Sequence, residues 1–173
     1  DTLELFDPVT DTFSLSPNPL SGVRREDTAT LLQDGRVLIA GGALRAGQEG
    51  SYPFTQIAEV FDPQTGMVTS TSGSMLAART QTFAYPLTDG RVLLGGGIEG
   101  QPPEVFDPAL DAFVPFSPGP SFRCLGGRCR LTELTDGAAL VTGGGKENAR
   151  LVSAEGAVSL APAPLLARQG HTA

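Results

Sequence analysis

One short pattern occurs three times along the chain and limits what the chain can fold into. A Phe-Asp-Pro triplet begins at Phe6, Phe61 and Phe106. An Asp-Gly pair follows each triplet at a nearly constant distance and begins at Asp34, Asp89 and Asp136. Such self-similarity is typical of repeat architectures, in which every unit has the same small fold and packs against its neighbours.

The middle unit shows what one repeat is expected to form. Residues 79–88 are rich in Thr and aromatic residues, and residues 91–94 form a short apolar run, so both segments predict strands. The Asp-Gly pair between them predicts a two-residue hairpin turn, because glycine accepts the positive φ that such a turn needs. Residues 103–106 and 112–115 predict two more strands, joined by a turn at Asp107-Pro108. Each repeat is therefore predicted to be a four-stranded antiparallel meander.

The repeats divide the chain into units that are not equally complete. Residues 1–20 hold only a third and a fourth strand, and complete units are predicted at 24–72, 78–117 and 127–162. Residues 166–173 open a further unit with a first strand. No segment predicts a long helix, so the expected fold class is all-β.

These repeats resemble those of the kelch family, which includes galactose oxidase-like propellers. The resemblance rests on the glycine doublet after an apolar strand, the following E-V-F-D-P strand and turn, an apolar residue beyond that turn, and an Arg near the start of the next unit. The apolar and Arg positions are Phe13, Val68, Phe113, Arg24, Arg79 and Arg168. The resemblance implies a kelch-type β-propeller with one blade per unit, partial in this chain. The tryptophan of many kelch fourth strands is absent, and Phe or Val occupies its place.

The number of blades predicts that the ring is incomplete. The chain holds three full blades, half a blade at the start and one strand at the end, whereas closed propellers usually have four to eight blades. Joining the two ends would give a blade without its second strand, and this would leave backbone groups unpaired inside a sheet. We therefore expect the chain to be part of a longer propeller or to pair with other chains.

Composition excludes several classes of protein. The net charge of −7 argues against binding to nucleic acid or to an anionic membrane surface, and no apolar run is long enough to insert as a transmembrane helix. His171 is the only histidine, so no metal site is expected, and no cofactor is predicted. Cys124 and Cys129 predict one local disulfide and hence an extracellular or cell-envelope location, with two reduced thiols as the alternative.

Two sets of charged residues recur with the repeat. Antiparallel pairing places Arg36 near Asp62 and Arg91 near Asp107, which predicts an Arg–Asp contact within each blade. The alternative is that each Asp caps its own Asp-Pro turn. A Glu also recurs at one strand position, in Glu4, Glu59 and Glu104. We expect this Glu to stabilise the blade rather than to bind a cation, because functional residues more often lie on variable loops.

The loops of variable length supply the candidate binding residues. By analogy with kelch proteins, the connections between second and third strands and between blades lie on one rim, whereas the Asp-Gly and Asp-Pro turns lie on the other. Aromatic, Arg and polar side chains on the variable rim are plausible for recognition, with solvated insertions as the alternative. These candidates are Arg45, Gln48, Glu49, Tyr52, Phe54, Phe122, Arg123 and Lys146.

The sequence therefore favours a non-catalytic binding or scaffolding module that recognises a protein or a glycan. Copper radical oxidases of the kelch-like type need several histidines and tyrosines, but this chain has one His and two Tyr. Two alternatives stay open. The chain could assemble with further copies through its open blade edges, or it could belong to a sugar-acting enzyme whose active residues lie outside it.

Overall fold

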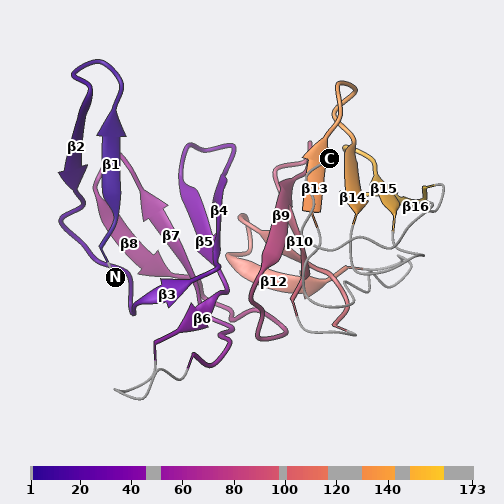
Figure 1. Cartoon of the computed structure of the whole chain (residues 1–173), viewed down its shortest axis with the longest axis horizontal. Coiled ribbons are helices and arrows are strands. Elements are labelled where there is room, and N and C mark those ends of the chain that lie inside the picture. Colours follow the sequence, from indigo (N-terminus) through magenta and orange to yellow (C-terminus); the bar gives the residue numbers. More distant parts are fainter. Residues whose placement is uncertain (1, 46–51, 98–100, 117–129, 143–148, 162–173) are drawn as a thin grey trace.

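The computed structural model describes residues 2–45, 52–97, 101–116, 130–142 and 149–161. These residues form strands, turns and connections, without a helix among them. A two-stranded sheet is followed along the chain by three four-stranded antiparallel sheets, and a second two-stranded sheet lies at one rim (Figure 1). The all-β class predicted from the repeats is confirmed.

Each four-stranded sheet has its strands in sequence order, as the meander prediction requires. The first unit contains β1 (Glu4–Asp7) and β2 (Thr12–Leu15). The second contains β4 (Thr28–Leu31), β5 (Val37–Ala40), β7 (Ala58–Asp62) and β8 (Met67–Ser70). The third contains β9 (Thr82–Pro86), β10 (Val92–Gly96), β11 (Glu104–Asp107) and β12 (Ala112–Pro115). The fourth contains β13 (Arg130–Glu133), β14 (Ala139–Thr142), β15 (Arg150–Val152) and β16 (Val158–Leu160). The sheet at the rim pairs β3 (Arg24–Arg25) with β6 (Ala43–Leu44) and was not predicted.

The Asp-Gly turns require glycine, but they are one residue longer than predicted. In the second unit the Leu32 N–H donates to the Arg36 carbonyl at 2.8 Å, and the Gly35 N–H donates to the Leu32 carbonyl at 3.0 Å. Three residues therefore form the loop, and Gly35 has a φ of 88°. A type I turn followed by a glycine bulge has this geometry. The predicted two-residue turn is wrong, whereas the predicted positive φ is confirmed.

Apolar residues from neighbouring units pack together, so the core lies between the sheets and not within one sheet. Alternate residues of a strand point to opposite faces, and each sheet therefore contacts both neighbours. Leu38 and Val60 of the second unit pack with Phe106 and Phe113 of the third. The third unit packs in the same way against the fourth, and the second against the first. This face-to-face stacking of short sheets is the arrangement of propeller blades.

The two ends of the strands form two different rims. The turns β1–β2, β4–β5 and β13–β14 all point toward the top of Figure 1, and β3 and β6 lie toward the bottom. The first strands of successive units lie next to each other: β4 contacts β9, and β9 contacts β13. We call the rim with β3 and β6 the loop rim and the opposite one the turn rim.

Candidate binding surface

A strip of backbone pairs crosses the loop rim and supports its side chains. Arg25 pairs with Ala43 in the β3–β6 sheet, and isolated bridges join Ala43 to Phe54 and Thr55 to Arg79. The Arg45 N–H adds a bond to the Val23 carbonyl at 2.8 Å. Segments from the start of two blades and from the long connection after β5 therefore form one continuous surface.

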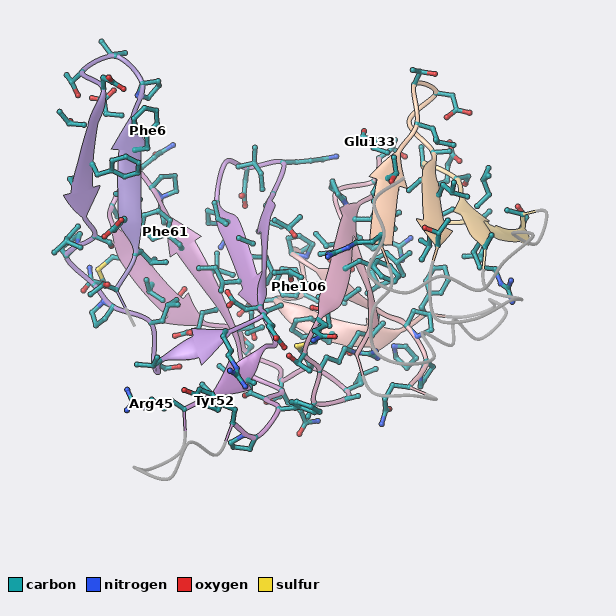
Figure 2. All side chains as sticks on the ribbon, viewed as in Figure 1. Phe6, Arg45, Tyr52, Phe61, Phe106 and Glu133 are labelled. Atoms are coloured by element: carbon teal, nitrogen blue, oxygen red, sulfur yellow. The ribbon has the colours of Figure 1, made fainter. Side chains whose placement is uncertain are left out.

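Arginine and aromatic side chains are exposed on this strip. The Arg25 guanidinium carbon lies 3.8 Å from the centroid of the Tyr52 ring, which is cation–π geometry. Phe54 is 45% exposed, and Arg45 is also exposed. Figure 2 shows Arg45 and Tyr52 close together at the lower edge of the molecule. The strip thus presents aromatic rings and guanidinium donors to solvent, which is the chemistry of contact recognition.

Three of the predicted binding residues are thus on this strip, namely Arg45, Tyr52 and Phe54. The other predicted binding residues lie outside the described residues, namely Gln48, Glu49, Phe122, Arg123 and Lys146. The two cysteines of the predicted disulfide, Cys124 and Cys129, lie outside them as well. Sequence reasoning did not include Arg25, because it lies in a different connection from Tyr52 and only the β3–β6 pairing brings the two together. No local signal in the sequence indicates that pairing.

Buried ion pairs lie beneath the strip. Arg24 pairs with Glu59, and Arg79 pairs with Glu104, with side chains that are almost completely buried. Arg79 Nε lies 2.6 Å from Glu104 Oε1, and its other nitrogens donate to the carbonyls of Gly96 and Pro102. Arg79 thus ties the opening of its blade to the second and third strands of that blade.

The same glutamates also bind the connection that enters each blade. The Leu76 N–H donates to Glu104 Oε2 at 2.6 Å, and the Ser21 N–H donates to Glu59 Oε1 at 2.9 Å. The two sites are not equal, because Nε and Nη1 of Arg24 are buried without a hydrogen-bond partner. The structure therefore supports the interpretation that the recurring Glu stabilises the blade.

On the turn rim the arginines pair differently from the prediction. Arg36 binds Asp34, with 2.8 Å between Nε and Oδ2, and the corresponding Arg91–Asp89 distance is 2.6 Å. The Arg36 hydrogen bond is the main cause that lowers the pKa of Asp34. No ion pair joins Arg36 to Asp62 or Arg91 to Asp107 among the described residues.

The aspartates of the Asp-Pro turns instead cap their own turns, as the alternative interpretation held. Asp62 Oδ1 accepts the Gln64 N–H at 2.8 Å, and Asp107 Oδ1 accepts the Ala109 N–H at 2.9 Å. Asp7 caps its turn in the same way through the Val9 N–H. These backbone bonds are the main cause that lowers the pKa values of Asp7 and Asp62. This local bond to a backbone N–H two residues away is favoured over the predicted Arg–Asp pair, because it does not require a long Arg side chain to be ordered.

Two cavities lie away from the strip. One of about 330 Å³ follows the inner strands β4, β9 and β13, and Thr28, Thr30, Thr82 and Arg130 supply its polar groups. The other, of about 230 Å³, lies on the turn rim between the second and third units and is lined by Asp34, Asp89 and Arg91 among others.

Within the described residues, no three His, Cys, Asp or Glu side chains are placed to hold a metal ion. No helix in the described part of the chain could cross a membrane.

Solved structures identify the class of fold. No family model matches the sequence, and no curated protein sequence matches it. The fold is that of a partial kelch-type β-propeller. One similar structure is YjhT, with a TM-score of 0.70 and 10% identity over 88% of this chain. Another is a fungal alcohol oxidase of the AA5 family in complex with copper, with a TM-score of 0.68 and 18% identity over 94% of this chain.

The present chain spans only part of both structures. It covers 56% of the YjhT chain and 35% of the oxidase chain. Identities this low establish the shared fold and leave activity to be argued from the residues of this chain.

Proposed function

We propose that this chain is a non-catalytic binding or scaffolding module that recognises a protein or a glycan through its loop rim. The observation that carries the proposal is the Arg25–Tyr52 pair, held on a paired backbone strip beside the exposed Phe54 ring. Aromatic and Arg side chains are enriched among residues that dominate binding energy at interfaces. Because the strip is built from backbone hydrogen bonds, little ordering is required when a ligand binds.

The chemistry of the rim suits either class of ligand. Exposed aromatic faces stack on the apolar face of a sugar or on an apolar side chain, and guanidinium groups donate to hydroxyl, carbonyl or carboxylate oxygens. The net charge of −7 disfavours a nucleic acid as the partner. The proposal includes an extracellular or cell-envelope location and a Cys124–Cys129 disulfide, which suit a Lys-poor, turn-rich binding domain.

A sugar-acting enzyme is the second candidate, and the fold of the copper oxidase favours it. That candidate needs reactive groups outside the described residues, because the described part of the chain holds no cluster of metal ligands. The binding module needs only the contacts already present on the loop rim.

The test compares two substitutions on the loop rim with one on the turn rim. The wild-type chain is screened on an array of neutral and acidic oligosaccharides and against a random-peptide phage library, and the tightest binder is titrated by calorimetry. Tyr52→Ala and Phe54→Ala are expected to weaken binding by at least about tenfold. Leu110→Ala is the matched control, since Leu110 is an exposed apolar residue of an Asp-Pro turn on the other rim. Equal affinities for all three variants, or no binder from either library, would contradict the proposal.

A further inference from the structure

The strip on the loop rim is a small sheet of three segments with an inner and an outer face. Arg25 pairs with Ala43, and Ala43 pairs with Phe54. Paired residues lie on the same face of a sheet, and successive residues of one strand point to opposite faces. The Arg24 side chain is buried, whereas Arg25 and Phe54 are exposed. Arg25 and Phe54 therefore belong to one outer face that points to solvent.

A second row of the same outer face contains Val23, Arg45 and Tyr52. The Arg45 N–H donates to the Val23 carbonyl at 2.8 Å, and the Leu44 N–H donates to the Pro53 carbonyl at 3.0 Å. This register places Arg45 opposite Val23 on one side and opposite Tyr52 on the other. Val23 is 45% exposed, and Figure 2 shows Arg45 and Tyr52 close together. The outer face thus has guanidinium groups beside apolar and aromatic side chains in two adjacent rows.

The two guanidinium groups of the outer face have no carboxylate partner in the described part of the chain. The ion pairs found there involve other arginines, not Arg25 or Arg45. The flat face of the Arg25 guanidinium stacks on the Tyr52 ring, so the N–H groups at the edge of its plane stay available as donors. Hydrogen bonds from a guanidinium to a carboxylate are among the strongest in proteins. The chemistry of this face therefore suits a ligand with carboxylates.

The spacing of the two arginines favours one pattern of carboxylates. Arg25 and Arg45 are diagonal neighbours across the β3–β6 pair, and such neighbours are about 7–8 Å apart. In an extended segment, residues two positions apart point to the same side and are about 6.6–6.8 Å apart. A short helix is a poorer match, since isolated helices of fewer than about 12–15 residues are marginal in water. Two acidic residues two positions apart on an extended segment therefore fit this face.

We propose that the outer face of the loop-rim strip binds an extended segment of another protein that carries two carboxylates two residues apart, flanked by apolar side chains. This inference rests on the proposed function and names the partner of the same surface. The carboxylates pair with Arg25 and Arg45, and the flanking apolar side chains pack on Val23 and Phe54. A protein segment suits this face better than a glycan, because Val23 is aliphatic and offers no ring on which a sugar could stack.

The sequence and the charge of the chain indicate that the partner is a different protein. No two acidic residues of these 173 residues are separated by a single residue, so a second copy of them does not provide the pattern. The net charge is −7, and the turn rim carries aspartates such as Asp34, Asp62 and Asp89. An acidic segment is repelled by the turn rim and attracted to the loop rim, which determines the side on which it binds.

The first test uses two synthetic peptides of identical composition. Ser-Leu-Ser-Glu-Ser-Glu-Ser-Leu-Ser has its Glu residues two apart, and Ser-Leu-Glu-Ser-Ser-Ser-Glu-Leu-Ser has them four apart. Each is titrated into the nitrogen-15-labelled chain, and amide chemical shifts give the affinity. We expect saturable shifts in residues 23–25, 43–45 and 52–55, and binding of the first peptide at least about tenfold tighter than that of the second. Equal affinities, or no saturable shift, would overturn the proposal.

Substitutions then separate the proposed ion pairs from the general effect of charge. Arg45→Ala should weaken binding of the first peptide by at least about tenfold. Arg91→Ala is the matched control and should leave the affinity unchanged, because it removes a half-exposed guanidinium on the turn rim. Two peptides with one Glu replaced by Lys should bind the wild-type chain weakly, and one of them should regain affinity for the Arg45→Glu chain. The same loss for Arg45→Ala and Arg91→Ala, or no regained affinity, counts against the proposal.

The oligosaccharide and peptide screens distinguish failure of this inference from failure of the proposed function. A neutral peptide or sugar that binds through Tyr52, when the acidic peptide does not bind, would support the loop rim as a binding surface and reject the acidic partner. An acidic oligosaccharide whose binding depends on Arg45 would reject a protein as the partner. Absence of any ligand at the loop rim would reject both proposals.

Discussion

At the scale of single residues, an Arg–carboxylate ion pair contributes differently to stability on the two rims. Arg79 and Glu104 are buried. The Arg79 side chain donates to Glu104 and to the carbonyls of Gly96 and Pro102, and Glu104 also accepts the Leu76 N–H. Arg91 and Asp89 are about half exposed. Charges at an exposed site interact through solvent and contribute little, whereas a buried charge depends on its partner. Burial therefore decides which arginines hold the fold together.

Arg79→Ala is expected to destabilise the chain by about 3–5 kcal/mol, because it leaves the Glu104 carboxylate buried without its partner. Arg91→Ala, at an exposed pair, is expected to cost less than about 1 kcal/mol. Urea unfolding followed by circular dichroism measures both. The double variant Arg79→Met with Glu104→Met should be more stable than Arg79→Ala alone, since no charge is then left unpaired. Similar losses for Arg79→Ala and Arg91→Ala would contradict this account.

The sequence located these residues but did not assign their partners. The recurrence of Arg24 and Arg79, and of Glu59 and Glu104, is visible in the repeat, yet no spacing shows that they meet across a blade. The Arg36–Asp62 contact was predicted from strand register, which is correct, since Val37 lies opposite Phe61. The side chain of Arg36 turns instead to Asp34. Strand register determines which residues face each other in the backbone. It does not determine which of the nearby carboxylates the Arg36 side chain binds, because that depends on the side-chain rotamer.

At the scale of secondary-structure elements, the glycine doublet allows the loop rim to close over the blade. Gly42 has a φ of 94°, and a Cβ on it would lie 2.8 Å from the Arg25 carbonyl oxygen. Its N–H donates to the Arg79 carbonyl at 2.7 Å. Side chains are therefore excluded here for two reasons, the backbone conformation and the close approach of β3. The β3–β6 sheet that causes the second was not predicted from the sequence.

Gly42→Ala and Gly35→Ala separate these two effects. Gly35 also has a positive φ, but nothing lies near the position of its Cβ, so Gly35→Ala is expected to cost roughly 1–2 kcal/mol from backbone strain. Gly42→Ala should cost clearly more, because the β3 backbone must also move. Urea unfolding gives both values, and amide exchange of Arg25 and Leu44 reports on the β3–β6 sheet. Equal costs, with unchanged exchange at β3 and β6, would show that the close approach contributes nothing.

At the scale of the whole molecule, stability comes from contacts between successive blades. The order and direction of the strands within the blades could be predicted, because hydrophobic alternation and turn residues are local signals. The candidate site could be predicted only in part. Loop length pointed to the rim that carries Tyr52, whereas the contact of Tyr52 with Arg25 depends on pairing between distant segments. Residues at equivalent positions of different repeats therefore differ in burial, according to whether a neighbouring blade covers them.

The Phe of the Phe-Asp-Pro triplet tests this dependence on neighbours directly. Phe6, Phe61 and Phe106 occupy one position in three successive units (Figure 2), and they are 50%, 5% and 1% exposed. Phe106→Ala and Phe61→Ala are expected to cost about 3–5 kcal/mol each, since both remove a ring from a packed contact between blades. Phe6→Ala should cost less than about 1 kcal/mol, as a substitution at a largely solvated position.

Urea unfolding of the three variants measures these costs under one set of conditions. Because the substituted residue and its strand position are the same, a difference among the three reflects packing against a neighbouring blade and not intrinsic strand propensity. A cost for Phe6→Ala as large as that for Phe106→Ala would mean that the open face of the first unit is covered in solution. Native mass spectrometry of the wild-type chain would then show whether a second copy provides the cover.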